Sequence, residues 1–237
     1  MFENFFPKAG ELIKTYGNYL LSGLKNTLII AVCAFLIGLV IGIVIAAIKV
    51  APKKYFRNPV VKWLFYALER IGDVYITIIR GTPVVVQLLL MYFAILAQTG
   101  IPALYVAIIV FGINSSAYMA EIIRAGILSI DKGQMEAGRS LGMSYITTMI
   151  RVVLPQAIKN IIPTMLNEFI ALLKETSVAG YITVIDVTMA TQRIVAREYE
   201  ALVPYIILAV IYLIIVLIFT LLVKAIERRM RKSDRPI

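Results

Sequence analysis

The chain has 237 residues, of which 60% are hydrophobic and only 16% are charged. Its mean hydropathy of +0.87 excludes an ordinary soluble domain and predicts that lipid is its main solvent. The formal net charge of +10 does not indicate nucleic-acid binding, because the basic residues cluster beside apolar runs, where they set membrane orientation. The single cysteine, Cys33, excludes an intrachain disulfide and leaves no second thiol for a metal site.

The apolar runs predict an all-α integral membrane protein with about five transmembrane helices. A helix needs roughly 20 mostly apolar residues to cross the ~30 Å hydrocarbon layer. The runs that meet this requirement lie at about 20–48, 75–97, 104–128, 158–178 and 203–223. Residues 19–223 therefore form one transmembrane domain, preceded by an extracytoplasmic or interfacial segment (1–18) and followed by a basic tail (224–237).

Two of the five runs are interrupted by residues that lipid does not tolerate. The run 75–97 contains Arg80 followed by glycine, threonine and Pro83, and the run 158–178 contains Asn167, Glu168 and a lysine–glutamate pair. Irregular or charged backbone at membrane depth persists only where protein or a water-filled cavity covers it. We therefore expect both segments to face the protein interior.

Orientation follows from the short loops, because lysine and arginine accumulate on the cytoplasmic side. The loop after the first run carries no acid and five basic residues, which are Lys49, Lys53, Lys54, Arg57 and Lys62. Placing this loop and the basic tail inside puts the N-terminus outside, residues 129–157 inside, residues 179–202 outside and the C-terminus inside.

Two local patterns concern helix placement. Residues 61–74 mix aromatic and charged side chains, which favours an amphipathic helix at the membrane interface. Gly38 and Gly42 are four residues apart on the first span, and such a pair of small residues lets a neighbouring helix approach closely. We interpret the glycine pair as a site of helix packing within the chain.

The polar loop 129–157 carries helix signals although it lies between two spans. Asp131 can cap a helix with its body at 134–141, which Gly142 can end. A second helical stretch at 145–153 is predicted to stop before Pro155. Two short helices joined at a glycine and projecting into the cytoplasm indicate a docking element.

A phosphate-binding loop is a poor interpretation of this segment. Gly133, Gly138, Arg139 and Ser140 nearly fit the pattern G-x-x-x-x-G-K-S/T. That pattern needs a preceding buried strand and a lysine that reaches the phosphates. Here arginine replaces the lysine and a membrane span precedes the loop, so we exclude ATP binding at this position.

The same residues resemble the loop of bacterial ATP-binding-cassette (ABC) import permeases, whose pattern is E-A-A-x-x-x-G-x(9)-I-x-L-P. The spacing is complete, and the two departures are Gly138 in place of alanine and Val152 in place of isoleucine. The residues that this resemblance marks for coupling to an ATPase are Glu136, Ala137, Gly138, Arg139, Gly142, Leu154 and Pro155. A short helix with charged and small residues can insert into a groove of a partner and form oriented ion pairs there.

The resemblance covers nearly the whole chain and narrows the subfamily. Three segments resemble those of permeases for polar amino acids, most like the arginine permeases. They are Arg80 to Pro83 followed by Gln87, the segment 117–121 followed by Arg124, and the segment 174–177. The resemblance implies a type I ABC importer permease fold in a bacterial cell membrane. It also implies a second permease subunit, with a homodimer favoured, two ATPase subunits that bind ATP and magnesium, and an extracytoplasmic amino acid binding protein. This chain itself is expected to be no enzyme and to hold no cofactor.

A zwitterion that crosses the membrane needs partners for both its ammonium and its carboxylate group. The candidate pathway residues are the polar ones within the spans, namely Arg80, Thr82, Gln87, Asn114, Ser115, Glu121, Asn167 and Glu168. Glu121 lies three residues before Arg124, so an internal ion pair and substrate contact are both open. Two further alternatives to substrate contact stay open. Asn114 and Ser115 could instead form hydrogen bonds between helices, and the break at Pro83 could be purely structural.

Acidic residues inside the spans favour a cationic substrate, so we expect arginine, lysine or histidine, with glutamine next. Transport would proceed by alternating access driven by the partner ATPases. The main alternative is an ion-coupled secondary transporter, although we find no internal repeat of the kind that such proteins commonly show. An intramembrane enzyme is disfavoured because the acids are scattered over different spans and histidine is absent.

Overall fold

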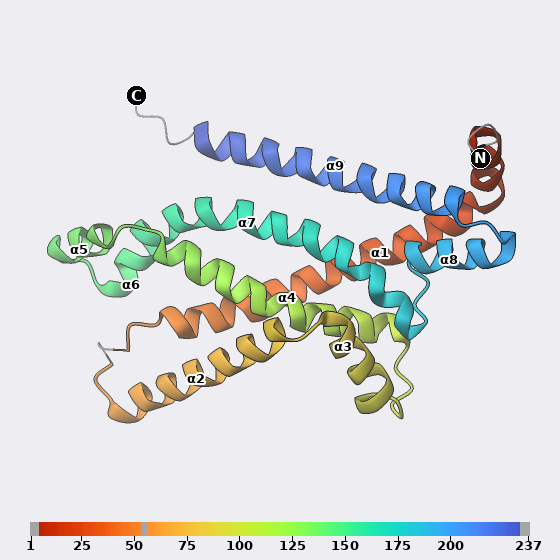
Figure 1. The fold of residues 1–237 in the computed structure, drawn as a ribbon. Coiled ribbons are helices and arrows are strands. Elements are labelled where there is room, and N and C mark those ends of the chain that lie inside the picture. Colours follow the sequence, from red (N-terminus) through yellow and green to blue (C-terminus); the bar gives the residue numbers. More distant parts are fainter. Residues whose placement is uncertain (1–4, 54–55, 233–237) are drawn as a thin grey trace. The chain divides into compact units, whose positions relative to one another are not determined.

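The computed structural model describes residues 5–53 and 56–232, with side chains to residue 230. Within this part every regular element is helical, which confirms the all-α prediction (Figure 1). The elements are α1 (Phe5–Val50), α2 (Pro59–Gly81), α3 (Val84–Leu89), η2 (Leu90–Ile95), α4 (Ala103–Leu128), α5 (Lys132–Ser140), α6 (Tyr145–Thr148), η3 (Met149–Val153), α7 (Leu154–Glu175), η4 (Thr176–Ile182), α8 (Val187–Glu198) and α9 (Leu202–Lys232). Of the elements labelled η, η2 and η3 are π-helical and η4 is a 3₁₀-helix.

Length and composition select three described helices as able to cross a membrane. They are α1, α4 and most of α9, and they contain the predicted spans 20–48, 104–128 and 203–223. The pair formed by α2 and the segment Val84–Ile95 makes a fourth if it is counted as one broken span. The predicted span 158–178 lies in α7 and the start of η4 and does not meet the same apolar criterion. A total of five spans therefore stays a prediction.

The chain divides into two compact units, and the long helices contribute to both. One unit comprises residues up to Leu36, Thr82–Gly112 and Phe169–Leu222, and the other comprises Ile37–Gly81, Ile113–Glu168 and the residues from Val223 onward. The core of the first unit is built around Leu88, Phe111 and Leu172. The second unit has a core of smaller side chains, including Ala46, Ala117, Ala120 and Ala157.

In the first unit, α1 holds the segment that leads into α8. The Asn26 side-chain amide donates to the carbonyl of Ile185 at 2.9 Å, and the backbone N–H of Val187 donates to the Thr27 hydroxyl at 3.2 Å. The buried Asp186 carboxylate caps α8 by accepting from the N–H groups of Thr188 and Met189. Burial raises the pKa of Asp186, and the two backbone donors oppose that shift.

In the second unit, the glycine pair on α1 permits close contact with α4. A Cβ atom on Gly38 would lie 2.9 Å from the Cβ of Ser115, and one on Gly42 would lie 2.5 Å from the Cβ of Met119. These separations leave no room for a side chain, so the predicted role in helix packing within the chain is confirmed.

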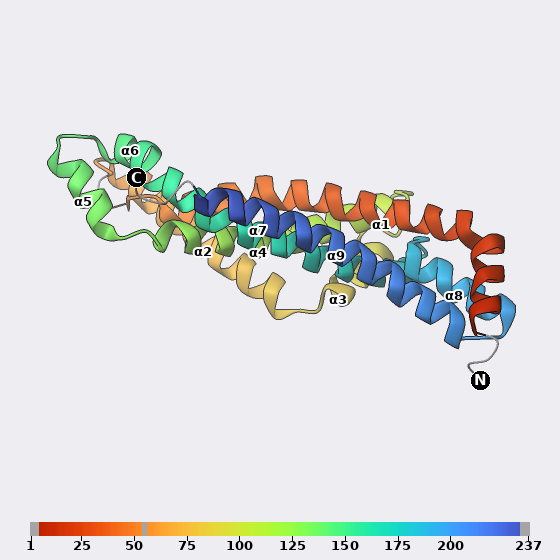
Figure 2. The ribbon, with the colours of Figure 1, turned by 90° about the horizontal axis from the view of Figure 1, so that it is seen from above.

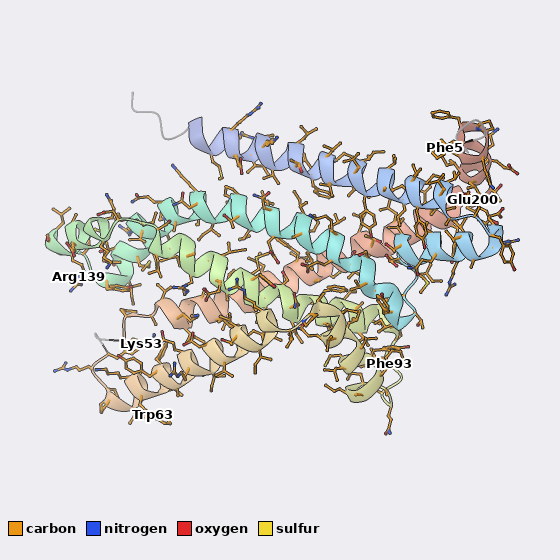
Figure 3. All side chains as sticks on the ribbon, in the orientation of Figure 1. Phe5, Lys53, Trp63, Phe93, Arg139 and Glu200 are labelled. Atoms are coloured by element: carbon orange, nitrogen blue, oxygen red, sulfur yellow. The ribbon has the colours of Figure 1, made fainter. Side chains whose placement is uncertain are left out.

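Large apolar side chains cover the outer surface of the described helices, as lipid contact requires. Trp63 on α2 is 70% exposed and Phe93 on η2 is 58% exposed, and both point away from the ribbon (Figure 3). The predicted interfacial segment 61–74 is the first part of the continuous helix α2. The first turns of α1 run in a different direction from the rest of that helix (Figure 2).

Candidate functional site

The loop between α4 and α7 forms the two short helices that its sequence predicts, and a docking role for them stays a prediction. The Asp131 side chain accepts from the Gly133 N–H at 2.7 Å and caps α5, and the helix ends at Ser140 with Leu141 as its C-cap. Gly142 has φ of 82°, and the N–H of Met143 returns to the carbonyl of Gly138 at 3.1 Å. That left-handed turn needs glycine. The cap at Asp131 and the stop at Gly142 are confirmed.

Gly138 departs from the alanine of the family pattern, and packing between α5 and α6 explains why. Gly138 is buried, and a Cβ atom added to it would lie 2.4 Å from Cγ2 of the fully buried Thr148. The threonine methyl therefore occupies the space that an alanine side chain would take. On the same helix, Glu136, Ala137 and Arg139 are exposed, and Arg139 points outward (Figure 3).

The predicted stop before Pro155 is wrong. α6 continues through the π-helical turn η3 into α7, which begins at Leu154 and also contains Pro163. A proline breaks an α-helix because it lacks the N–H that bonds to the residue four positions earlier. The π-helical turn changes that bonding pattern directly before Pro155, so the helical path can continue.

The predicted break in the second apolar run is present at Thr82 and Pro83. α2 ends at Gly81 and α3 begins at Val84, with Pro83 at the N-cap position in an extended conformation. The Gln87 side-chain amide donates to the Thr82 hydroxyl at 2.8 Å and to its carbonyl at 3.2 Å. Two candidate pathway residues are thus joined across the break.

The other candidates belong to the second unit and differ in exposure. The exposed Arg80 places its guanidinium 5.0 Å from the ring centroid of Tyr118, a cation–π contact. Asn114 is 4% exposed, and Ser115 is fully buried against α1, where its hydroxyl has no hydrogen-bond partner within the described chain. Asn167 is exposed and Glu168 is half-buried on α7. Substrate contact by these residues stays a prediction.

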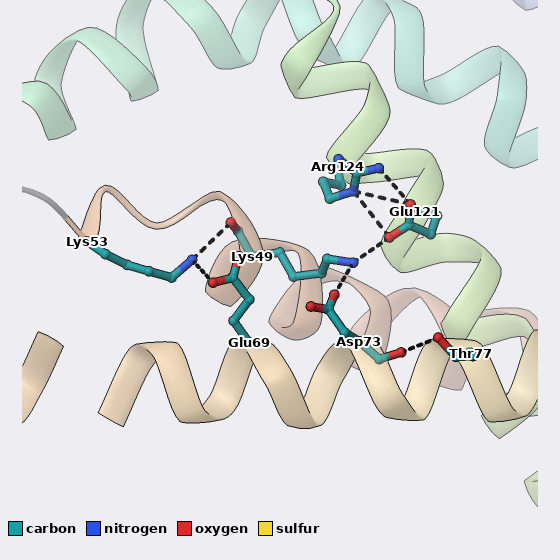
Figure 4. A network of polar contacts seen from close by, with 7 residues as sticks. All are labelled: Lys49, Lys53, Glu69, Asp73, Thr77, Glu121 and Arg124. Carbon is teal, nitrogen blue, oxygen red and sulfur yellow. Dashed lines mark hydrogen bonds and ion pairs between the residues drawn. The ribbon is translucent and has the colours of Figure 1, made fainter. Parts of the chain in front are cut away.

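Glu121 has two cationic partners, one of which the sequence did not suggest. Arg124 donates from Nε to both carboxylate oxygens at 3.2 Å and from Nη2 to Oε2 at 2.8 Å. Lys49, at the end of α1, donates to Oε1 at 2.7 Å and also lies 2.9 Å from Oδ1 of Asp73 on α2 (Figure 4). The predicted internal pair is therefore present, as part of a four-residue ionic network that joins α1, α2 and α4.

Lys53 and Glu69 continue this charged region with an ion pair of 2.7 Å (Figure 4). The sequence pattern accounts for Lys49 and Lys53 by membrane orientation alone, and for Asp73 and Glu69 by an interfacial helix. Their pairing depends on how α1 and α2 pack together, for which residue spacing gives no signal. Among the described residues no group of three or more metal-binding side chains is positioned to hold a metal ion.

The family model for binding-protein-dependent transport system inner membrane components matches residues 62–232. The chain belongs to this family. It is the membrane permease of a transport system, and the ATPase activity that the ABC resemblance implies resides in a separate subunit. The matched region includes α5, α6 and all of the residues predicted to couple to an ATPase.

Several curated permeases are similar over almost their full length. The arginine transport system permease protein ArtQ of Bacillus subtilis (strain 168) is 40% identical over 218 residues, which cover 91% of this chain and 94% of that protein. The glutamine transport system permease protein GlnP of Escherichia coli (strain K12) is 37% identical, with coverage of 90% and 93%. The L-cystine transport system permease protein TcyB of Bacillus subtilis (strain 168) is 37% identical, with coverage of 88% and 85%.

Solved structures confirm the type I ABC importer permease fold. A chain from the crystal structure of an amino acid ABC transporter with histidines has a TM-score of 0.83 and 41% identity, and the match covers 97% of this permease and 100% of that chain. A chain of the MetNI methionine ABC transporter in an inward-facing conformation has a TM-score of 0.73 at 20% identity, with coverage of 90% and 96%. At 20% identity, the similarity to the MetNI chain supports the fold alone.

Proposed function

We propose that this permease imports polar amino acids into the cytoplasm, with arginine, lysine and histidine preferred and glutamine next. The observation that carries the proposal is the similarity, over nine-tenths of the chain, to permeases named for arginine and glutamine transport. The likeness to an amino acid transporter structure at 41% identity supports the same substrate class. The ion-coupled alternative lacks comparable support, because the matched family is that of binding-protein-dependent systems.

The transporter would contain two permease subunits, favoured to be identical, two ATPases that bind ATP and magnesium, and an extracytoplasmic binding protein. The N-terminus would lie outside and α5 and the C-terminus inside, as the basic loops indicate. The binding protein delivers the amino acid from outside. Closure of the ATPases on ATP then moves α5 and α6, and the spans reorient around the substrate.

α5 is suited to dock in a cleft of the ATPase. Its exposed Glu136 and Arg139 offer charges of both signs, while the buried Gly138 lets α6 pack closely behind it. Oriented charges on a small rigid element set the register of an interface. The joint between α5 and α6 is held by the glycine turn at Gly142, so a push on α5 is transmitted to α6 and, through η3, to α7.

Charge reversal at Glu136 tests the coupling role. Glu136→Lys is expected to reduce the ATPase that co-purifies with the permease about tenfold, equivalent to ~1.4 kcal/mol of binding free energy. The measurement is the ATPase-to-permease ratio after affinity purification from cells that express both. Glu11→Lys, at an exposed acid on α1, is the control. Equal ratios for Glu136→Lys and the control would remove the docking role.

Glu168 is proposed to favour cationic substrates. Glu168→Gln removes the negative charge with little change of shape, so the preference for arginine over glutamine should fall by about tenfold, as the loss of one favourable charge contact allows. The measurement is competitive uptake of both amino acids by the reconstituted transporter. Glu11→Gln serves as the matched control because its side chain is exposed and lies outside the predicted pathway. An unchanged preference in Glu168→Gln would exclude this residue as a determinant of specificity.

A further inference from the structure

A cavity of about 480 Å³ lies beside the ionic network in the second unit. The ends of α1 and α4 line it, and α2 contributes Glu69 and Asp73. The short helices of the loop between α4 and α7 also line it, through Lys132 and Met135 of α5, Tyr145 of α6 and Met149 of η3. The cavity therefore connects the network of Figure 4 with the docking element.

The charges that line the cavity are mixed. Lys49, Arg124 and Lys132 are cationic, and Glu69, Asp73 and Asp131 are anionic. Within the network, the recorded bonds of Arg124 use Nε and Nη2, and the ion pair of Asp73 uses Oδ1. Nη1 of Arg124 can therefore donate to a ligand and Oδ2 of Asp73 can accept from one, and these side chains are 33% and 41% exposed.

This arrangement fits a small molecule that carries both charges. A carboxylate can accept from a guanidinium and an ammonium group, and an α-ammonium can donate to a carboxylate. The aliphatic part of such a molecule can lie against Met135, Met149 and the Tyr145 ring. Pockets of about 300–1,000 Å³ hold small-molecule ligands, so the volume accommodates one amino acid.

We infer that this cavity is a cytoplasmic-side amino acid site through which the imported product slows its own transport. The inference rests on the proposed function and on the proposed orientation. A bound zwitterion contacts the span ends and the coupling elements together, so it stabilises one position of α5 and α6. ATP-driven cycling requires these elements to move. Because a ligand that binds one state better than the other shifts the equilibrium toward that state, the bound amino acid slows the cycle.

The test uses the complete transporter in inside-out proteoliposomes, with the ATPases facing the bath and the binding protein and arginine enclosed. Arginine is then added to the bath and ATP hydrolysis is measured. We expect bath arginine to inhibit hydrolysis. N-acetylarginine, which lacks the ammonium, and agmatine, which lacks the carboxylate, are expected to fail, because the cavity binds both groups.

Two cavity variants and one matched control locate the effect. Met149→Trp fills the cavity and Lys132→Met removes a cation, and each should raise the half-inhibitory arginine concentration about tenfold. Ile158→Trp adds the same ring at an exposed position on α7 and should behave as the wild type. If the Met149→Trp permease does not assemble into the complete transporter, Lys132→Met still tests the site.

The possible outcomes separate the two proposals. If enclosed arginine stimulates hydrolysis but bath arginine has no effect, or inhibits both cavity variants as strongly as the wild type, the cytoplasmic site is excluded while the transport function stands. If enclosed binding protein and amino acid do not stimulate ATP hydrolysis at all, the proposed function fails and the cytoplasmic site fails with it.

Discussion

Gly42→Ala is expected to lower the thermal stability of the permease in detergent, because the added methyl group meets Met119. The new Cβ would lie 2.5 Å from the Met119 Cβ and 3.0 Å from the Ala120 backbone nitrogen. Both neighbours are close to the α4 backbone, so rotation of a side chain cannot relieve the overlap. Forcing extra volume into a packed interface typically costs about 1–3 kcal/mol. We expect a fall in Tm of several degrees and less folded protein.

Gly17→Ala provides the matched control on the same helix. A Cβ atom on Gly17 would meet nothing within 4 Å, and alanine favours a helix more than glycine does. Both variants are measured by size-exclusion chromatography after heating. A Tm for Gly42→Ala that equals that of Gly17→Ala would contradict the close packing of α1 against α4 in the second unit.

Removing the charge of Glu121 is expected to destabilise the permease through the ionic network. Glu121→Gln leaves Arg124 without its carboxylate and leaves Lys49 with Asp73 alone. The Lys49 and Glu121 side chains are only 12% and 21% exposed, so water compensates poorly for the lost partners. A double-mutant cycle with Lys49→Met should give an interaction energy of about 1–3 kcal/mol, measured from the unfolding of the purified permease.

The pair formed by Lys8 and Glu200 is the comparison for this cycle. Its charged atoms are 3.8 Å apart and the Lys8 side chain is 41% exposed, so its interaction energy should stay within ~0–1 kcal/mol. Lys8→Met and Glu200→Gln complete that second cycle. If the two cycles gave the same energy, the network would not hold α1 against α4 more firmly than an ordinary surface pair does.

The helices of the docking element were predictable because their signals are local. Asp131 and Gly142 act on backbone groups within a few residues of themselves, and the structure places both as the sequence indicates. The continuation through Pro155 was not predictable, because a π-helical turn changes the bonding pattern on which the proline rule depends. The alanine-to-glycine departure at Gly138 was visible, but its cause, the Thr148 methyl, appears only when α6 packs on α5.

The ionic network could be predicted from the sequence only in part. The spacing of Glu121 and Arg124 predicts their pair, since residues three apart share a helix face. Lys49 lies 72 positions before Glu121, and no periodic pattern connects residues so distant. The position of Lys49 in a basic loop is explained by membrane orientation, so the sequence gives no reason to expect its ion pairs with Glu121 and Asp73. The cavity beside it depends on the same packing and was missed for the same reason.

The energy source of transport tests the central claim most directly. The permease is reconstituted with its ATPase partner and its binding protein, and uptake of radiolabelled arginine is followed with ATP, without ATP, and under imposed proton or sodium gradients. We predict uptake only when ATP and the binding protein are both present, and no ATP hydrolysis by the purified permease alone. Uptake driven by an ion gradient without ATP, or ATP hydrolysis by the permease alone, would contradict the account.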